Sequence, residues 1–331
     1  MTRTKTILSQ PFKERYFMSK KGIMIVNLGT PDKPETKEVR AYLKRFLGDK
    51  RVIDTNRFIW LPILHGIILR TRPKKSAALY QKIWEEAGSP LLIYTKSQAE
   101  QLQARFPDQV VRYAMSYSQP LIPEVLQEMH TLGVTDLTVI PLYPQYSTTT
   151  TAPIFDEVAK FYLNAEAIPS LHFIQSFYDE PLYIDALANQ IKQALSEKKV
   201  DKIIFSYHGI PVSYVKKGDP YLEHCQQTTQ AVMDQVGDVP FISTFQSKFG
   251  PAEWLTPATD QTLKELPKTG VKNILILTPG FVSDCLETVE EIEKENCGYF
   301  IENGGDYFRY IHPFNEDPEL IDILEKIVQD H

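Results

Sequence analysis

Cysteine is scarce in this chain of 331 residues, which contains only Cys225, Cys285 and Cys297. No two of them form a CxxC pair, so the sequence excludes a zinc ribbon and a four-cysteine iron–sulfur site. Three scattered cysteines also exclude a disulfide framework. We therefore expect a reducing compartment, the cytoplasm.

Long apolar runs and an excess of basic charge are missing as well. The most apolar stretch, residues 58–75 (FIWLPILHGIILRTRPKK), falls short of the ~20 residues of a membrane-spanning helix. Its basic end fits peripheral contact with an anionic membrane, but a helix end packed in the core or a wall of a binding site fits equally well. The formal net charge of −6 gives no sign of a nucleic-acid partner.

The sequence also lacks the glycine-rich motifs of phosphate-binding loops. No GxGxxG follows a predicted strand and no GxxxxGK[ST] occurs, so dinucleotide and P-loop nucleotide binding lose support. Residues 1–21 are basic and lack an apolar core, which excludes a secretory signal and predicts a flexible N-terminal tail.

What the chain does contain is an alternation of short apolar runs with amphipathic segments. The runs predict strands over 22–28, 110–116, 136–142, 171–175, 202–207, 239–245 and 273–278. The amphipathic segments predict helices that include 35–47, 121–132, 182–197, 221–236 and 316–328. Such alternation favours an α/β fold with parallel sheets covered on both faces.

The predicted strands fall into two sets that divide near residue 178. We therefore expect two Rossmann-like domains, 22–178 and 179–331, with a cleft between them. The first would carry an apolar lip at 58–75, and the final helix would pack back on this first domain. Ligands of such sheets bind beyond the carboxyl ends of the strands, so the residues there are the candidates for function.

Two strand ends carry notable side chains. His208 follows the predicted strand 202–207, although a lone histidine is as often structural as catalytic. Residues 143–153 (YPQYSTTTTAP) place tyrosines, including Tyr146, at another strand end, where an aromatic wall would suit a flat apolar ligand. The hydroxyls of residues 147–151 fit the cap of a following helix.

The last predicted strand leads into an unusually acidic segment, residues 274–298 (ILILTPGFVSDCLETVEEIEKENCG). Ser283 or Asp284 fits a helix cap. On a helix, Glu287, Glu291 and Glu295 lie one above the other, where like charges destabilise by ~0.2–0.5 kcal/mol per pair. A solvated acidic face remains open beside a path for protons or a divalent cation.

Several motifs together resemble the ferrochelatase family, bacterial type without an iron–sulfur cluster. They are VNLGTPDKPE, GSPLLIYTKSQAEQLQ, PLYPQYSTTTTAP, SYHGIP, TFQSKFGPAEWLTP and GFVSDCLETVEEI, and they run in order from residue 22 onward. The resemblance implies insertion of Fe²⁺ into protoporphyrin IX with loss of both pyrrole protons, or, as the alternative, into coproporphyrin III. No cysteine follows Cys297, so no iron–sulfur cluster or other cofactor is expected.

The resemblance also implies roles for individual residues. His208 and Glu287 are expected as catalytic and metal-binding groups that face each other across the porphyrin. An acidic relay is expected next to Glu287, with the members Asp284, Glu291 and Glu295. Its helix is often locally widened in relatives. The porphyrin is expected to contact Leu28, Tyr117, Tyr146, Trp254 and Phe281, shielded by a lip around residues 58–69 that faces a membrane.

The chemistry explains why such residues are needed. Aromatic walls can hold a bent macrocycle whose nitrogen lone pairs point out of the ring plane. An unperturbed imidazole has a pKa of ~6.5, so a neutral histidine can accept a pyrrole proton or bind Fe²⁺. We favour His208 as proton acceptor and Glu287 as metal ligand, and the reverse division stays open.

Rival interpretations remain at this point. Two Rossmann-like halves and the E-x₇-E spacing of Glu287 and Glu295 also occur in some nucleotide-sugar glycosyltransferases. A non-catalytic porphyrin or haem carrier would use the same cleft but leaves the acidic row unexplained. A cobalt or nickel chelatase is a narrower variant, and monomer and dimer are both allowed.

Overall fold

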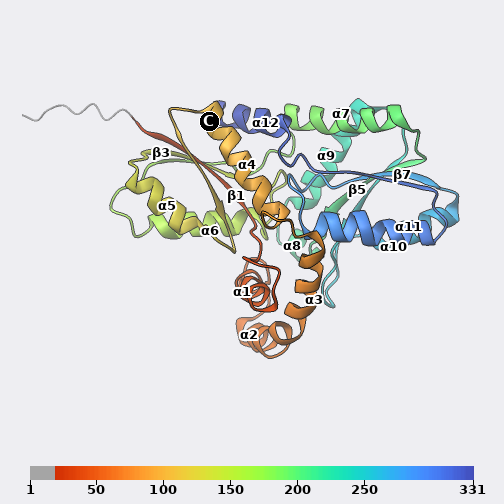
Figure 1. The fold of residues 1–331 in the computed structure, drawn as a ribbon, viewed down its shortest axis with the longest axis horizontal. Coiled ribbons are helices and arrows are strands. Elements are labelled where there is room, and N and C mark those ends of the chain that lie inside the picture. Colours follow the sequence, from red (N-terminus) through yellow and green to blue (C-terminus); the bar gives the residue numbers. More distant parts are fainter. Residues whose placement is uncertain (1–18) are drawn as a thin grey trace, which may run out of the picture.

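The computed structural model describes residues 19–331, and its centre consists of two four-stranded sheets with all strands parallel (Figure 1). The strand orders are β2-β1-β3-β4 and β6-β5-β7-β8. The predicted α/β class with two Rossmann-like halves is confirmed. The flexible tail predicted for residues 1–21 lies mostly outside the described residues, and Lys21 already belongs to β1.

Each of the predicted strands occurs within a few residues of its expected position. The bounds are β1 Lys21–Asn27, β2 Val110–Met115, β3 Asp136–Pro141, β4 Ser170–Phe173, β5 Lys202–His208, β6 Phe241–Gln246, β7 Asn273–Leu277 and β8 Tyr307–Ile311. The strand β8 was not among those that the apolar runs predicted. This strand lies at a sheet edge and buries only Tyr310 fully, so its residues form no continuous apolar run.

Helices connect the strands and cover the sheets. The α-helices are α1 Thr36–Phe46, α2 Arg57–Ile63, α3 Leu69–Ile83, α4 Pro90–Arg105, α5 Ile122–Thr131, α6 Thr151–Tyr162, α7 Pro181–Glu197, α8 Val212–Lys216, α9 Tyr221–Val236, α10 Thr259–Glu265, α11 Cys297–Glu302 and α12 Pro318–Gln329. Three further helical segments have other hydrogen-bond patterns, namely η1 Leu64–Ile68, η2 Leu266–Thr269 and η3 Glu287–Asn296.

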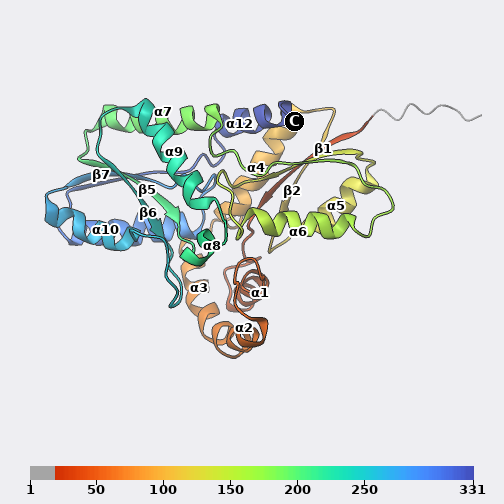
Figure 2. The same cartoon turned by 180° about the vertical axis from the view of Figure 1, so that it is seen from behind.

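Three layers are visible in both views. The helices α7 and α12 lie along one side of the sheets, and α5, α6, α10 and α11 lie along the other (Figures 1 and 2). The largest apolar core crosses both halves, because Ile23 and Ile140 of the first sheet belong to the same buried cluster as Phe205 and Leu275 of the second. Shared burial therefore holds the two sheets together.

The last helix connects the halves as well. Arg105 of α4 forms ion pairs with Asp322 at 2.8 Å and Glu325 at 3.0 Å on α12. Leu102 of α4 and Leu320 of α12 belong to the core that spans both sheets. The C-terminal end of the chain thus covers a helix of the first sheet.

The strand order places a topological switch point at the carboxyl end of β5. β5 lies between β6 and β7. The chain passes from β5 to β6 on one side and from β7 to β8 on the other, so the strand order reverses between β5 and β7. Parallel sheets bind ligands at such a switch point. His208 is the last residue of β5, and η3 follows β7 after a short loop.

The acidic segment forms a π-helix, η3, that continues into α11. In a π-helix each backbone N–H bonds to the carbonyl five residues back, and this rare geometry often occurs at functional sites. The side chains of Thr288, Ile292 and Asn296 are buried, so one face of η3 packs on the protein. The local widening implied by the family resemblance therefore extends over the ten residues of η3.

The apolar stretch 58–75 forms a helical projection. Together α1, α2 and α3 extend beyond the layered sheets (Figures 1 and 2). Trp60 and Leu64 are buried at its centre, whereas Phe58 is 91% exposed and Ile59 and Ile67 are each 58% exposed. Within residues 19–331, no helix combines the length and apolar character needed to cross a bilayer.

Candidate active site

His208 occupies the carboxyl end of β5, opposite Gln246 of the neighbouring strand β6. Its Nδ1 lies 2.8 Å from the carbonyl oxygen of Gly209. A carbonyl can only accept a hydrogen bond, so Nδ1 must carry the proton in this contact. The neutral ring then keeps the lone pair of Nε2 for a proton or a metal ion.

Glycine is required directly after His208. A Cβ atom on Gly209 would lie 2.8 Å from the carbonyl oxygen of Gln246 and 3.1 Å from the indole ring of Trp254. The absence of a side chain lets the Gly209 N–H donate to that same carbonyl at 2.8 Å. The predicted porphyrin contact Trp254 therefore lies beside the His208 strand end.

The two residues at the end of β6 bind the acidic helix. Gln246 donates from Nε2 to the backbone carbonyl of Glu287 at 3.0 Å. Ser247 donates its backbone N–H and its hydroxyl to the carboxylate of Glu291. Ser247 has φ of +63°, a left-handed conformation that is strained for a residue with a side chain. The strand end that carries His208 and the row of acids are thus joined through Gln246 and Ser247.

The electrostatics of Glu291 show that the central groups are neighbours. Burial raises the pKa of its carboxyl, and the negative charge of Glu287 raises it further. The hydrogen bonds from Ser247 act in the opposite direction, as does the positive charge of His208 when its ring is protonated. The structure therefore brings together three of the predicted residues, His208, Glu287 and Glu291.

The other two predicted members of the acidic relay lie in different surroundings. Glu295 is exposed and accepts a hydrogen bond from the hydroxyl of Tyr299 at 2.7 Å. Asp284 is buried and accepts from the hydroxyl of Thr288 at 2.7 Å and from the side chain of Asn315 at 2.8 Å. Asp284 is thus part of a polar network at the start of η3.

The expected helix caps at Ser283 and Asp284 are wrong. Neither side chain accepts a backbone N–H of the helix, because Asp284 is bonded to side chains and Ser283 accepts from Gln98 at 2.8 Å. The hydroxyl run before α6 likewise gives its first turn no side-chain cap. Ser147 donates to the buried carboxylate of Asp219 at 3.0 Å and so links the two halves of the protein.

A cation that sequence reasoning missed compensates part of the acidic charge. Lys82 of α3 forms an ion pair with Glu290, and Lys294 lies 3.7 Å from the other oxygen of the same carboxylate. The sequence indicated Lys294 alone as a nearby cation. Lys82 is distant along the chain, and only the packing of α3 against η3 places it there.

Glu287 lies near a group of buried hydroxyls and a thiol. Burial raises the pKa values of Tyr42, Tyr80 and Tyr143, and the charge of Glu287 raises them further. The pKa of the Cys285 thiol is raised for the same two reasons. All four groups therefore stay protonated. Tyr143 begins the stretch 143–153 that the sequence indicated as an aromatic wall, whereas no sequence signal indicated Tyr42 and Tyr80.

Two of the predicted porphyrin contacts lie in one apolar cluster. Leu28 and Tyr117 pack there with Leu286 and Val289 around the acidic helix and with the helices of the projection. The Tyr117 hydroxyl donates to Asp49 at 2.9 Å. The cluster thus connects the end of β1 to η3.

Two other predicted contacts occupy loops after strands. The backbone N–H of Tyr146 donates to Nδ1 of His224 at 3.2 Å, and burial raises the pKa of the Tyr146 hydroxyl. Phe281 is partly buried in the turn after β7, where its N–H donates to the carbonyl of Thr278 at 3.0 Å. Both residues therefore lie at carboxyl ends of strands, as predicted.

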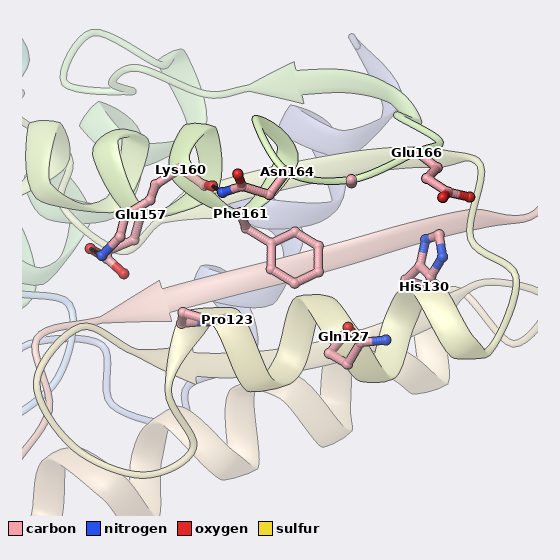
Figure 3. A pocket seen from close by; sticks show the side chains of 9 residues that line it. Pro123, Gln127, His130, Glu157, Lys160, Phe161, Asn164 and Glu166 are labelled. Atoms are coloured by element: carbon pink, nitrogen blue, oxygen red, sulfur yellow. Dashed lines mark hydrogen bonds and ion pairs between the residues drawn. The ribbon is translucent and has the colours of Figure 1, made fainter.

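Hollows on the surface lie away from these residues. An open hollow of about 690 Å³ lies between α5 and α6, where Gln127, His130 and Phe161 line it (Figure 3). Another of about 330 Å³ lies along residues 50–58. None of the predicted site residues lines either hollow. In the described part of the chain, no three His, Cys, Asp or Glu side chains converge into a metal site.

Solved structures that resemble this chain are chelatases of low sequence identity. "SirB from Bacillus subtilis with Fe3+" aligns with a TM-score of 0.56 and 14% identity, and it covers 94% of this chain and 95% of its own. CbiX, described as the terminal enzyme for biosynthesis of sirohaem in denitrifying bacteria, aligns at 0.52 with 12% identity and covers 93% and 98%. At such identities the likeness concerns the fold.

Sequence relatives are much closer. The Coproporphyrin III ferrochelatase of Enterococcus faecalis is 53% identical over 94% of this chain and 99% of its own length. The Coproporphyrin III ferrochelatase of Lactococcus lactis subsp. cremoris is 49% identical over 94% and 96%, and the Ferrochelatase of Marinobacter nauticus is 47% identical over 94% and 86%. The Ferrochelatase family model matches residues 20–331. The chain therefore belongs to the ferrochelatase family.

Proposed function

We propose that this ferrochelatase inserts Fe²⁺ into coproporphyrin III. The resemblance in the sequence favoured protoporphyrin IX, but relatives at 53% and 49% identity carry the name Coproporphyrin III ferrochelatase. These names support the alternative substrate at least as well. Family membership makes the chain a metal chelatase and sets the glycosyltransferase interpretation aside.

The single observation that carries the proposed mechanism is the convergence of His208, Glu287 and Glu291 at the end of β5. With Nδ1 bonded to the Gly209 carbonyl, Nε2 of His208 is the free nitrogen. In the mechanism it takes a pyrrole proton, since a positioned histidine is an effective general base. Proton loss exposes the nitrogen lone pairs to the entering metal ion.

The carboxylates have a complementary role. Glu287 supplies an oxygen ligand as Fe²⁺ enters, and the porphyrin nitrogens replace the protein ligands as the metal moves into the ring. Burial raises the pKa of Glu291, which makes this carboxylate a better proton acceptor than an exposed one. Glu291 then receives the proton from His208, and the exposed Glu295 passes it toward solvent. This transfer restores the neutral imidazole, which takes the second pyrrole proton by the same route.

An anaerobic assay with the two porphyrins side by side tests the substrate. We expect kcat/KM for Fe²⁺ insertion to be at least about tenfold higher with coproporphyrin III, or ~1.4 kcal/mol in transition-state binding. An equal or higher value with protoporphyrin IX would contradict the proposal. Absence of turnover with either porphyrin, despite binding, would support the carrier interpretation.

The exposed apolar side chains of the projection support peripheral membrane contact. Phe58, Ile59 and Ile67 are exposed on it, and the basic residues Arg70 and Lys74 follow. Apolar side chains flanked by cations suit the surface of an anionic bilayer.

Flotation with anionic vesicles of phosphatidylglycerol and phosphatidylcholine tests this contact. We expect the wild-type protein to float and the Phe58→Ser/Ile59→Ser variant to remain in the soluble fraction. Leu163→Ser is the matched control, since Leu163 is 83% exposed at the end of α6. Equal flotation of the variant and the control would count against the proposal.

A further inference from the structure

The loop after β8 carries a histidine that contacts the acidic helix on both sides of Glu287. Nδ1 of His312 lies 2.9 Å from Oδ2 of Asp284, and its Nε2 lies 3.4 Å from Oε1 of Glu293. Both partners are carboxylates, which accept hydrogen bonds. The contact with Asp284 is a hydrogen bond and the contact with Glu293 is an ion pair, so a carboxylate beside each ring nitrogen favours the charged imidazolium.

The Asp284 end of this bridge is firmly anchored. Oδ2 of Asp284 also accepts from Asn315 Nδ2 at 2.8 Å, and the Asp284 N–H donates to Asn315 Oδ1 at 2.7 Å. Its other oxygen accepts from the hydroxyl of Thr288 at 2.7 Å. Thr288 directly follows Glu287, so the network reaches the backbone next to the predicted metal ligand.

The contacts of His312 with Asp284 and Glu293 stabilise η3, which depends on contacts with other elements. A π-helix is rare, and its hydrogen bonds alone stabilise it poorly, so contacts from other elements must hold it. Asp284 precedes Glu287, and Glu293 lies on a later turn of η3. One side chain that holds both carboxylates therefore fixes the part of η3 that presents Glu287.

We propose that His312 is a positioning residue, whose imidazolium bridges Asp284 and Glu293 and thereby holds Glu287 in place for metal insertion. This inference rests on the proposed function of the site. His312 touches neither His208 nor Glu287, so it acts through the helix.

The charges around His312 favour the bridging form. The hydrogen bond to Asp284 raises the pKa of His312 above its ordinary value against the effect of burial, and the charge of Glu293 adds to the increase. The Tyr310 ring lies 4.7 Å away on β8. From the α4 side, the titratable group near Asp284 is the neutral Tyr94, and beyond Asn315 the chain carries the acids Glu316 and Asp317. The carboxylates around His312 therefore favour the protonated ring.

His312→Gln tests the inference because glutamine can donate to one carboxylate but not to both. We expect kcat for metal insertion to fall about tenfold at neutral pH while KM for the porphyrin changes less than about twofold. The advantage of the wild-type enzyme should shrink as the pH rises through the raised pKa of His312, since the wild-type bridge is then lost too. His130→Gln is the control and should behave as wild type, because His130 is an exposed residue of α5 that lines the hollow beside α6.

A second measurement does not depend on turnover. Amide hydrogen exchange of residues 287–296 should be faster in His312→Gln than in wild type, and Glu293→Gln should give an intermediate effect. Unchanged exchange together with an unchanged kcat across pH would overturn the inference. A wild-type protein that inserts no metal, but whose η3 loses protection in His312→Gln, would instead contradict the proposed function alone.

Discussion

Ser247 donates its backbone N–H and its hydroxyl to the two carboxylate oxygens of Glu291, at 2.8 and 2.5 Å. It does so from a left-handed backbone conformation that glycine adopts without strain. The contact orients the carboxylate that lies between Glu287 and the exposed Glu295. Its cost in backbone strain indicates that the orientation matters.

Variants of Ser247 separate orientation from stability. Ser247→Ala and Ser247→Gly both remove a hydrogen bond to a carboxylate, worth about 1.5–3 kcal/mol, and should lower kcat by a similar factor of at least ten. Glycine also relieves the left-handed strain, so Ser247→Gly should be about 1 kcal/mol more stable than Ser247→Ala. Urea denaturation measures the stability of the two variants, and steady-state kinetics measure their kcat. If the less stable variant also had the lower kcat, the loss of activity would reflect stability, and the orienting role of Ser247 would be contradicted.

Replacement of His208 addresses the proton acceptor directly. His208→Ala should abolish insertion of Fe²⁺ and Zn²⁺ but leave porphyrin binding, followed by the Soret band, largely intact, because loss of a positioned general base costs about 10²–10⁴-fold. His130→Ala serves as the control. Wild-type rates in purified His208→Ala would show the assignment to be wrong.

Replacement of a carboxylate in the acidic row should lower kcat more at Glu287 than at Glu295. Glu287→Gln removes a carboxylate beside buried tyrosines and should lower kcat at least about a hundredfold. Glu295→Gln changes an exposed side chain that accepts a hydrogen bond from Tyr299, and it should cost less than about threefold in kcat. Kinetics with Fe²⁺ and Zn²⁺ compare the two. Equal losses would mean that the outer end of the row is as important as the inner end.

Gly209 should tolerate no side chain. In Gly209→Ala the new Cβ would meet the Gln246 carbonyl at 2.8 Å, closer than such contacts allow, so the end of β5 must shift. We expect a loss of about 1–3 kcal/mol in unfolding free energy and a large loss of activity. Gly298→Ala is the control, because a Cβ there meets nothing within 4 Å. Full activity of Gly209→Ala would argue against close packing at the site.

The ion pair between Arg51 and Asp156 predicts a pH-dependent contribution to stability. Two hydrogen bonds of 2.8 Å join them, and Arg51 holds the pKa of the Asp156 carboxyl below its ordinary value. A lowered folded-state pKa stabilises the protein above the unfolded pKa of about 3.9, and the effect is lost as the pH falls through the folded value. The side chains are 37% and 34% exposed, so screening limits the contribution to about 1 kcal/mol.

Thermal unfolding of Asp156→Asn measures this contribution. The variant should have a lower Tm than wild type at pH 7, and the difference should decrease toward pH 3. Glu157→Gln, which loses only an exposed pair with Lys160, should match wild type at both pH values. A difference that does not depend on pH would point to packing instead of charge.

The sequence predicted those features that depend on local pattern. Apolar runs identified the strands, and chain order placed His208 and Glu287 after strands that prove to be neighbours in one sheet. The pattern could not predict contacts that depend on tertiary packing, such as Lys82 with Glu290 or His312 with Asp284. The caps at Ser283 and Asp284 failed for a related reason, because Ser283 bonds to Gln98 and Asp284 bonds to Asn315, both distant along the chain.

The packing of α12 on α4 has a consequence for synthesis of the protein. The ribosome makes α4 long before α12, and domains generally begin to fold N-terminal first. Until α12 emerges, the apolar face of α4 around Leu102 and the charge of Arg105 lack the partners that cover them in the folded molecule. The nascent first half therefore leaves this apolar surface of α4 uncovered until α12 has been synthesised.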